Sequence, residues 1–245
     1  MGLSSEAGFT STILSAYYFL SSNYNLGYKK DEIILVGYSR GAFIVRCLAE
    51  FISEVGLLRR IALPFLGLLF KYWVNGKKED LTKLKSTLRS DETPDGLQLL
   101  YNVDITVLAE FDPVSAIYQL DNYKGITDSE RGKVPSRVQN AFLAMALNEK
   151  RPPYKPMLWK TTAPAVGLKV NVRQCAFLGC HGDIGGGNED SGLSQLSLLW
   201  MVAQVQQATN KKGSRGVQFD ENLLLQFATP SAAFHEGKME GLSDP

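Results

Sequence analysis

The segment IILVGYSRGAF, residues 33–43, carries the strongest indication of the fold. Its first part, Ile33 to Val36, is an unbroken apolar run of the kind found in buried strands of a parallel sheet. Gly37 to Gly41 has the pattern G-x-S-x-G, and helical spacing resumes from Ala42 to Ile52. Because a strand that turns abruptly into a helix exposes the serine hydroxyl at the turn, Ser39 is predicted to be a nucleophile.

The G-x-S-x-G pattern is common by composition alone, so the strand before it and the helix after it carry the prediction. Gly37 and Gly41 are expected at the two ends of the pattern because a β-carbon at either position would clash in so tight a turn. The alternative interpretation is a plain turn between a strand and a helix, with no chemical role.

Before and after this turn, helical and strand-like segments alternate along the chain. Periodicity predicts helices over Gly8–Tyr24, Val134–Leu147 and Leu193–Gln206, and strands over Ile105–Ala109 and Val172–Leu178. This order predicts a doubly wound, mostly parallel sheet with helices on both faces, as in α/β-hydrolase-like proteins. We therefore expect one α/β domain over residues 1–245.

Residues 57–102 form an interval too long for a simple crossover between the first two predicted strands. Apolar residues at helical spacing, followed by a charged stretch, predict a helical insertion there. The insertion is either a set of helices packed on the domain edge or a lid or acyl-chain groove beside the site. Residues 228–245 are predicted to be an irregular tail.

A serine hydroxyl needs a base that takes its proton, and the chain has two histidines. His181 follows the strand predicted at 172–178, so it would lie at the carboxyl edge of the sheet, where open α/β sheets bind ligands. His235 lies in the polar tail. We expect His181 to be the base, with His235 as the alternative.

The base needs an acid that holds its imidazole in the right tautomer. Asp112 follows the strand predicted at 105–109 and fits the chain order Ser, Asp, His. The alternative interpretation is that Asp112 and Pro113 merely begin a turn. Asp183 is the rival acid, but its place two residues after His181 suits a brace for the adjoining loop.

That loop, HGDIGGG over residues 181–187, is too rich in glycine to be ordinary packing, and it contains Gly185 and Gly186. It lacks the Gly-Lys-Ser/Thr ending of a phosphate-binding loop, which argues against nucleotide binding. An ester hydrolase also needs donors for the oxyanion. The backbone N–H of Arg40 is the expected first donor, whereas the earlier strand that normally supplies the second is missing before Ile33.

Composition narrows the function further. The net charge of +1 does not favour nucleic acid as a partner. Hydrophobic residues make up 44% of the chain, which is too ordinary a share for a membrane protein. Three cysteines are too few for a disulfide scaffold, and Cys175 and Cys180, five apart along a strand, would point to opposite faces. We expect no metal and no cofactor. Met1 is followed by no basic start and no apolar run, so a cytoplasmic location is expected, with unconventional export left open.

Five motifs then occur in order: GYSRGAF (37–43), FDPV (111–114), AMALNEKR (144–151), KPMLW (155–159) and GCHGDIGGG (179–187). Together they resemble the α/β-hydrolase domain of the Tle-type phospholipase effectors of type VI secretion and of related bacterial and fungal proteins. The resemblance runs from about Gly8 to Gln206. It implies a triad of Ser39, Asp112 and His181 and a glycerophospholipid or other ester substrate.

Two departures from that family stand out. Its members typically begin with strands and an Asp-Gly-Thr segment before the helix that starts here at about Gly8, so we expect the first strands to be missing. Pro113 stands where the family usually has threonine, and it removes a backbone donor beside the proposed acid. Two hypotheses follow: a serine hydrolase of lipid or other esters, or a catalytically inactive fragment or binding module with an open sheet edge. Transient membrane contact and the oligomeric state stay open.

Overall fold

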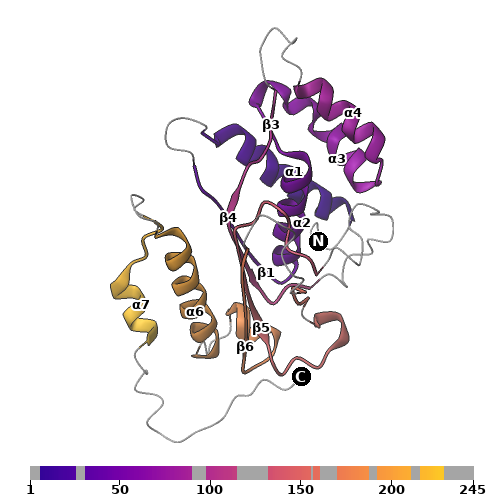
Figure 1. The fold of residues 1–245 in the computed structure, drawn as a ribbon. Coiled ribbons are helices and arrows are strands. Elements are labelled where there is room, and N and C mark those ends of the chain that lie inside the picture. Colours follow the sequence, from indigo (N-terminus) through magenta and orange to yellow (C-terminus); the bar gives the residue numbers. More distant parts are fainter. Residues whose placement is uncertain are drawn as a thin grey trace, which may run out of the picture.

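The computed structural model describes residues 6–25, 31–89, 98–114, 132–155, 157–160, 170–187, 192–210 and 216–228, and Figure 1 shows their arrangement. His235 and the predicted tail from residue 229 onward lie outside the described residues.

Four parallel strands form the sheet on which the candidate site is built (Figure 1). In spatial order they are β1 (Ile33–Tyr38), β4 (Ile105–Phe111), β5 (Asn140–Ala146) and β6 (Asn171–Phe177). The three predicted strands are confirmed as β1, β4 and β6. Since all four strands run the same way, the residues that follow them gather at one edge of the sheet.

The helix predicted over Val134–Leu147 is wrong, because residues 140–146 form β5 in the middle of the sheet. Alanine, leucine and methionine favour helices, which is why the stretch AFLAMA reads as one. Ala141, Phe142, Leu143 and Ala144 are nonetheless all buried, since β5 is covered on both faces. A short apolar run buried on two faces cannot be assigned to strand or helix from its periodicity.

Helices cover both faces of the sheet, as expected for an α/β fold with a mostly parallel sheet. On β4, Ile105 and Leu108 pack with the core that contains α1 and α2. Val107 and Ala109 of the same strand point the other way and pack against α6. Helix α7 packs beside α6 (Figure 1). These helices are α1 (Glu6–Asn23), α2 (Arg40–Val55), α6 (Gly192–Thr209) and α7 (Glu221–Ala228).

The described residues of the segment predicted as a helical insertion, 57–89 and 98–102, include the helices α3 and α4 and join the core beside α2. Phe51 of α2 lies 5.0 Å from Trp73 of the insertion, measured between ring centroids. In Figure 1, α3 and α4 lie at the opposite end of the molecule from the carboxyl ends of β5 and β6. The elements are β2 (Leu57–Leu58), η2 (Arg60–Phe65), α3 (Leu66–Val74), α4 (Lys78–Arg89) and β3 (Leu99–Leu100), with β2 antiparallel to β3.

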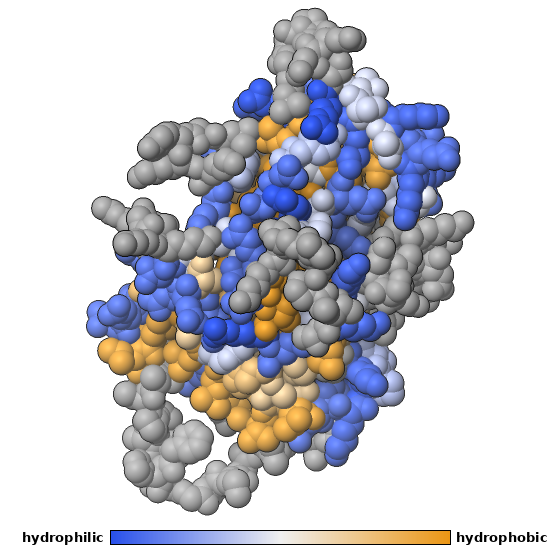
Figure 2. All heavy atoms as spheres, viewed as in Figure 1, coloured by the Kyte–Doolittle hydropathy of each residue, from blue (hydrophilic) through white to orange (hydrophobic). Residues whose placement is uncertain are grey.

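Exposed apolar side chains gather over the lower half of the face in Figure 2. Leu147 and Leu178, which directly follow β5 and β6, are 60% and 63% exposed. Leu223 and Leu225 on α7 are also exposed. None of the helices in the described part of the chain is long and apolar enough to cross a membrane.

Candidate active site

Ser39 lies at the sharp turn between β1 and α2. Its backbone conformation, with φ 57° and ψ −122°, is one that residues other than glycine rarely adopt. Backbone hydrogen bonds hold it there: Ser39 N–H donates to Phe111 O (2.8 Å), and the N–H groups of Phe43 and Val114 both donate to Ser39 O (3.3 Å each). Strained backbone of this kind persists only where the surrounding structure enforces it, and it is concentrated at functional sites.

The two glycines of the turn differ in what they allow. A β-carbon on Gly37 would lie 2.5 Å from the Gly41 carbonyl oxygen, so only glycine fits at position 37. The same expectation is wrong for Gly41, where a β-carbon would meet nothing within 4 Å. Gly41 lies in the first turn of α2, and its missing side chain would point into open space.

Asp112 directly follows β4, and its side chain is completely buried. Its Oδ1 accepts a hydrogen bond of 2.9 Å from the N–H of Ala146, at the end of β5. The residue has φ 44°, a second strained position, although a residue before proline normally prefers extended backbone. Pro113 has no N–H, but both oxygens of the Asp112 carboxylate have hydrogen-bond partners on other elements, Ala146 N–H at Oδ1 and His181 Nδ1 at Oδ2.

His181, at the start of α5 (His181–Gly185), joins these two side chains. Its Nδ1 lies 2.7 Å from Asp112 Oδ2, and its Nε2 lies 2.7 Å from Ser39 Oγ. With the proton on Nδ1, the imidazole donates to the carboxylate and accepts from the serine hydroxyl. The structure thus brings the three predicted residues, from the ends of three strands, into one hydrogen-bonded chain.

Two tyrosine rings lie against the His181 imidazole. Tyr38 of β1 stacks on it, with ring centroids 5.0 Å apart and planes inclined by 25°. Tyr154 of η3 (Pro152–Tyr154) lies 4.9 Å away at 58°. Neither tyrosine was singled out from the sequence. Tyr38 stands inside the G-x-S-x-G pattern, so its adjacency to Ser39 was the available signal, whereas no local pattern relates Tyr154 to His181.

Glu149 and Arg151 support the same histidine from the chain after β5. Glu149 Oε2 accepts the His181 backbone N–H (3.1 Å), and the carboxylate also accepts from Arg151 Nε (2.9 Å) and its terminal nitrogen (2.7 Å). The Arg151 hydrogen bonds lower the pKa of Glu149 to about 2. Both residues lie in the motif at 144–151, but no pattern within that motif predicts a role for them at His181.

Asp183 forms hydrogen bonds within the first turn of α5. Its Oδ2 accepts the backbone N–H of Cys180 (2.8 Å) and lies 3.2 Å from the Cys180 thiol, which closes the first turn of α5. This geometry matches the bracing role expected from the sequence. Gly186, with φ 77°, ends α5.

A buried ion pair joins α2 to β4, the strand that precedes Asp112. Arg46 donates to both oxygens of Glu110, at 2.8 and 2.6 Å, and to the carbonyl of Met157 at 2.9 Å. Its guanidinium lies 3.7 Å from the centre of the Trp159 ring. Burial raises the pKa of Glu110, and Arg46 opposes that rise. The pair was not predicted, because 64 residues separate its members.

Residues 2–204 match the model of the family described as T6SS phospholipase effector Tle1-like, catalytic domain. The chain belongs to this family. It is also 27% identical over 166 residues to the uncharacterized protein YEL023C of Saccharomyces cerevisiae, a match that covers 66% of this chain and 23% of the yeast protein.

Among solved structures, an uncharacterized protein from Pseudomonas aeruginosa is similar over 83% of this chain and 27% of its own, at 19% identity and a TM-score of 0.39. The Tle1-like chain thus spans about a quarter of the length of each of these relatives.

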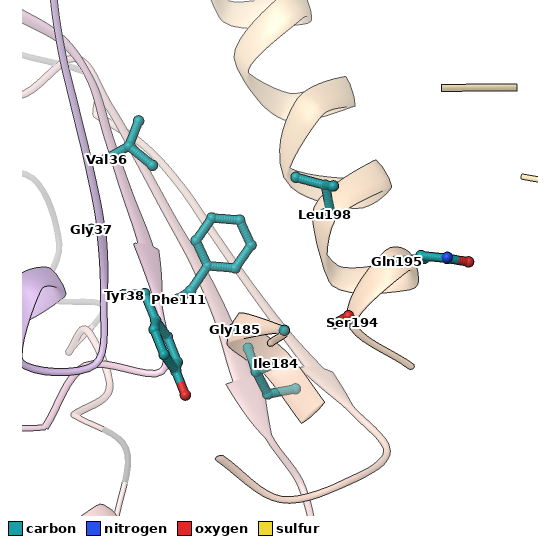
Figure 3. Close-up of a pocket in the computed structure, with 10 residues that line it drawn as sticks. Val36, Gly37, Tyr38, Phe111, Ile184, Gly185, Ser194, Gln195 and Leu198 are labelled. Atoms are coloured by element: carbon teal, nitrogen blue, oxygen red, sulfur yellow. The ribbon is translucent and has the colours of Figure 1, made fainter. Parts of the chain in front are cut away.

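A cavity of about 430 Å³ adjoins the site of this Tle1-like domain (Figure 3). Val36, Phe111, Ile184 and Leu198 give it a largely apolar lining, and Ser194, Gln195 and the glycines of the two turns complete it. Tyr38 also lines the cavity, and its ring stacks on the His181 imidazole.

Within the described ranges, no three His, Cys, Asp or Glu side chains come close enough together to hold a metal ion.

The Arg40 backbone N–H lies at the first residue of α2, where N–H groups have no helical acceptor one turn earlier. The positive end of the helix dipole at this terminus suits an anion beside Ser39.

Proposed function

We propose that this chain is a serine hydrolase that cleaves carboxylic esters of lipids through an acyl-enzyme. Ser39 is the nucleophile, His181 the general base and Asp112 the acid that orients it. The observation that carries the proposal is the unbroken chain of two 2.7 Å hydrogen bonds from Asp112 through His181 to Ser39. Its placement on a strained elbow, with the acid buried, supports the same assignment.

In the proposed reaction, His181 Nε2 takes the Ser39 proton while Oγ attacks the ester carbonyl carbon. The imidazolium that forms is stabilised by the Asp112 carboxylate. The negative charge on the carbonyl oxygen is held by the Arg40 N–H at the start of α2. His181 then gives its proton to the departing alkoxide, and the alcohol leaves. Water, deprotonated by the same nitrogen, attacks the acyl-enzyme, which releases the acid and restores the Ser39 hydroxyl.

The proposal includes an α/β-hydrolase-like, doubly wound arrangement of the sheet. Three features support it: the nucleophile follows β1, the acid follows the neighbouring strand β4, and the base follows β6. Helices on both faces of a parallel sheet agree with it as well.

A lipid ester is the substrate class we favour, because the family is one of phospholipase effectors. The apolar cavity beside Tyr38 offers a surface for an acyl chain, and its volume of about 430 Å³ suits a ligand of that kind. Leu147 and Leu178, exposed next to the site, suit a transient contact with a membrane surface. A glycerophospholipid unites these requirements.

One observation favours the second candidate, a binding module without activity. Among the strands described, β1 pairs only with β4, and Val36 on β1 is 55% exposed. An open strand edge with an exposed apolar side chain is a site at which another polypeptide could pair.

Ester hydrolysis by the purified chain separates the two candidates. We expect release of p-nitrophenol from short-chain and long-chain p-nitrophenyl esters and of fatty acid from phosphatidylcholine vesicles. Asp112→Asn should lower kcat by about 10⁴-fold while the fold is kept, since the imidazole would then be held in the wrong tautomer. A folded wild-type chain that hydrolyses none of these esters would favour the binding module.

A further inference from the structure

The His181 imidazole is held between two aromatic rings that come from different parts of the chain. Tyr38 stacks on it from the end of β1, and Tyr154 lies against it from η3. Centroid distances of 5.0 and 4.9 Å fall within the range at which aromatic pairs attract. The imidazole edges are engaged at the same time, by Asp112 at Nδ1 and by Ser39 at Nε2.

Tyr38 is fixed by two contacts with α5. Its hydroxyl donates to the His181 carbonyl at 3.1 Å, and its ring lies over Gly185. A β-carbon on Gly185 would come 2.2 to 2.5 Å from the Tyr38 ring atoms, so the ring can lie there only because residue 185 is glycine. Burial raises the pKa of Tyr38 to about 12, which keeps the phenol neutral and able to donate this hydrogen bond.

Tyr154 is fixed by a cation. The Arg151 guanidinium carbon lies 4.2 Å from the centre of the Tyr154 ring, and the same guanidinium pairs with Glu149. Glu149 in turn accepts the His181 backbone N–H. Arginine, glutamate and tyrosine thus connect η3 to the first residue of α5.

We infer that Tyr38 and Tyr154 form an aromatic clamp, defined as these two rings, which positions the His181 imidazole and stabilises its protonated form. The inference rests on the proposed function, in which His181 gains a proton as Ser39 attacks. The faces of aromatic rings carry negative electrostatic potential, so they attract an imidazolium more than a neutral imidazole. The clamp therefore contributes most when the base is charged, which is what a rate enhancement requires.

Other groups near His181 also act on its charge. Asp112 favours the protonated ring directly. Glu149 contacts the His181 backbone, with Arg151 paired to it, and Asp183 and Cys180 lie in the first turn of α5. The tyrosine substitutions remove none of these charged groups, so a change in the charge of His181 that they cause is assigned to the rings.

The experiment compares Tyr38→Leu and Tyr154→Leu with the matched Phe variants and with Tyr101→Leu. Tyr101 is a half-buried tyrosine that donates to Lys85 O in the insertion, so it controls for the general cost of this substitution. Each clamp Leu variant should lower kcat/KM for p-nitrophenyl butyrate about 3- to 10-fold, mainly through kcat. The Phe variants should lose about 2-fold or less, and Tyr101→Leu should match the wild type.

The pH dependence tests the charge argument. Without a ring, the acid limb of kcat/KM should move to lower pH, because protonation of the base becomes less favourable. The His181 Cε1–H resonance should titrate at correspondingly lower pH, and a His235→Gln variant assigns it, since the chain has two histidines. The resonance can be followed even if the wild type cleaves no ester, which keeps failure of the clamp distinct from failure of the proposed function.

An unmoved titration in folded Tyr38→Leu and Tyr154→Leu variants would overturn the clamp, as would equal losses in the Phe and Leu variants. If Tyr38→Leu does not fold, Tyr154→Leu alone decides, because Tyr154 is only half-buried and its replacement should disturb the fold less.

Discussion

A β-carbon on Gly37 would lie 2.5 Å from the carbonyl oxygen of Gly41, whereas a β-carbon on Gly41 would meet nothing within 4 Å. Close approach of the backbone thus requires glycine at position 37 but not at position 41. Gly37 lets the end of β1 approach the first turn of α2 closely enough to lift Ser39 out of the sheet. Gly41 faces open space.

Substitution of the two glycines should therefore have unequal effects. Gly37→Ala must push backbone against backbone, and we expect a loss of stability on the order of 1–3 kcal/mol. Gly41→Ala should be neutral or stabilise by up to about 1 kcal/mol, since alanine narrows the unfolded ensemble without a clash. Urea unfolding of both variants measures this, and equal losses would argue against the turn geometry.

Arg46 and Glu110 are buried together, so removing one partner should cost more than removing both. Arg46→Met leaves an unpaired carboxylate in the core and should destabilise the fold by about 3–5 kcal/mol. The double variant Arg46→Met, Glu110→Met should recover much of that loss. Chemical denaturation of the single and double variants supplies the comparison. A double variant less stable than the single one would mean that the charges stabilise the core beyond their mutual pairing.

Glu149 supports the His181 backbone only while it is ionised. Its pKa is lowered to about 2, so its contribution to stability is complete above the unfolded value of about 4.3 and is lost as the pH falls toward 2. Glu149→Gln should lower Tm at pH 7, and the difference from wild type should shrink between about pH 4 and pH 2. Calorimetry at several pH values tests this sign. A difference that grows toward low pH would contradict it.

Leu147 and Leu178 are proposed to meet a lipid surface. The double variant Leu147→Ser, Leu178→Ser should bind phosphatidylcholine–phosphatidylglycerol vesicles about tenfold more weakly or worse, because two apolar side chains no longer enter the interface. Hydrolysis of soluble p-nitrophenyl butyrate should be kept. Leu223→Ser with Leu225→Ser, two exposed leucines on α7, is the matched control in flotation assays. Equal weakening in both pairs would point to nonspecific adhesion.

The elbow could be predicted from sequence because its strand, turn and helix are consecutive, so local residue preferences determine them. The places of Asp112 and His181 followed from one rule, that residues after parallel strands meet at one edge. The assignment of residues 140–146 failed for the converse reason. Whether AFLAMA forms a strand depends on the elements that pack on both of its faces, and its own six residues do not identify those elements.

The support around His181 was invisible for a related reason. Glu149, Tyr154 and Tyr38 lie 32, 27 and 143 residues from it along the chain, and only the folded sheet brings them together. The glycine-rich loop indicated that Gly185 is more than ordinary packing. The physical reason is that Gly185 leaves room for the ring of Tyr38, which belongs to a strand far earlier in the chain.

The most direct test of the central claim is labelling of the purified chain with a fluorophosphonate probe, which reacts with activated serines. We predict stoichiometric labelling of the wild type at Ser39 and none in Ser39→Ala or His181→Ala, since loss of a triad member typically lowers the rate about a millionfold. A folded wild-type chain that the probe leaves unlabelled, or labelling that persists in Ser39→Ala, would contradict the assignment of Ser39 as the nucleophile.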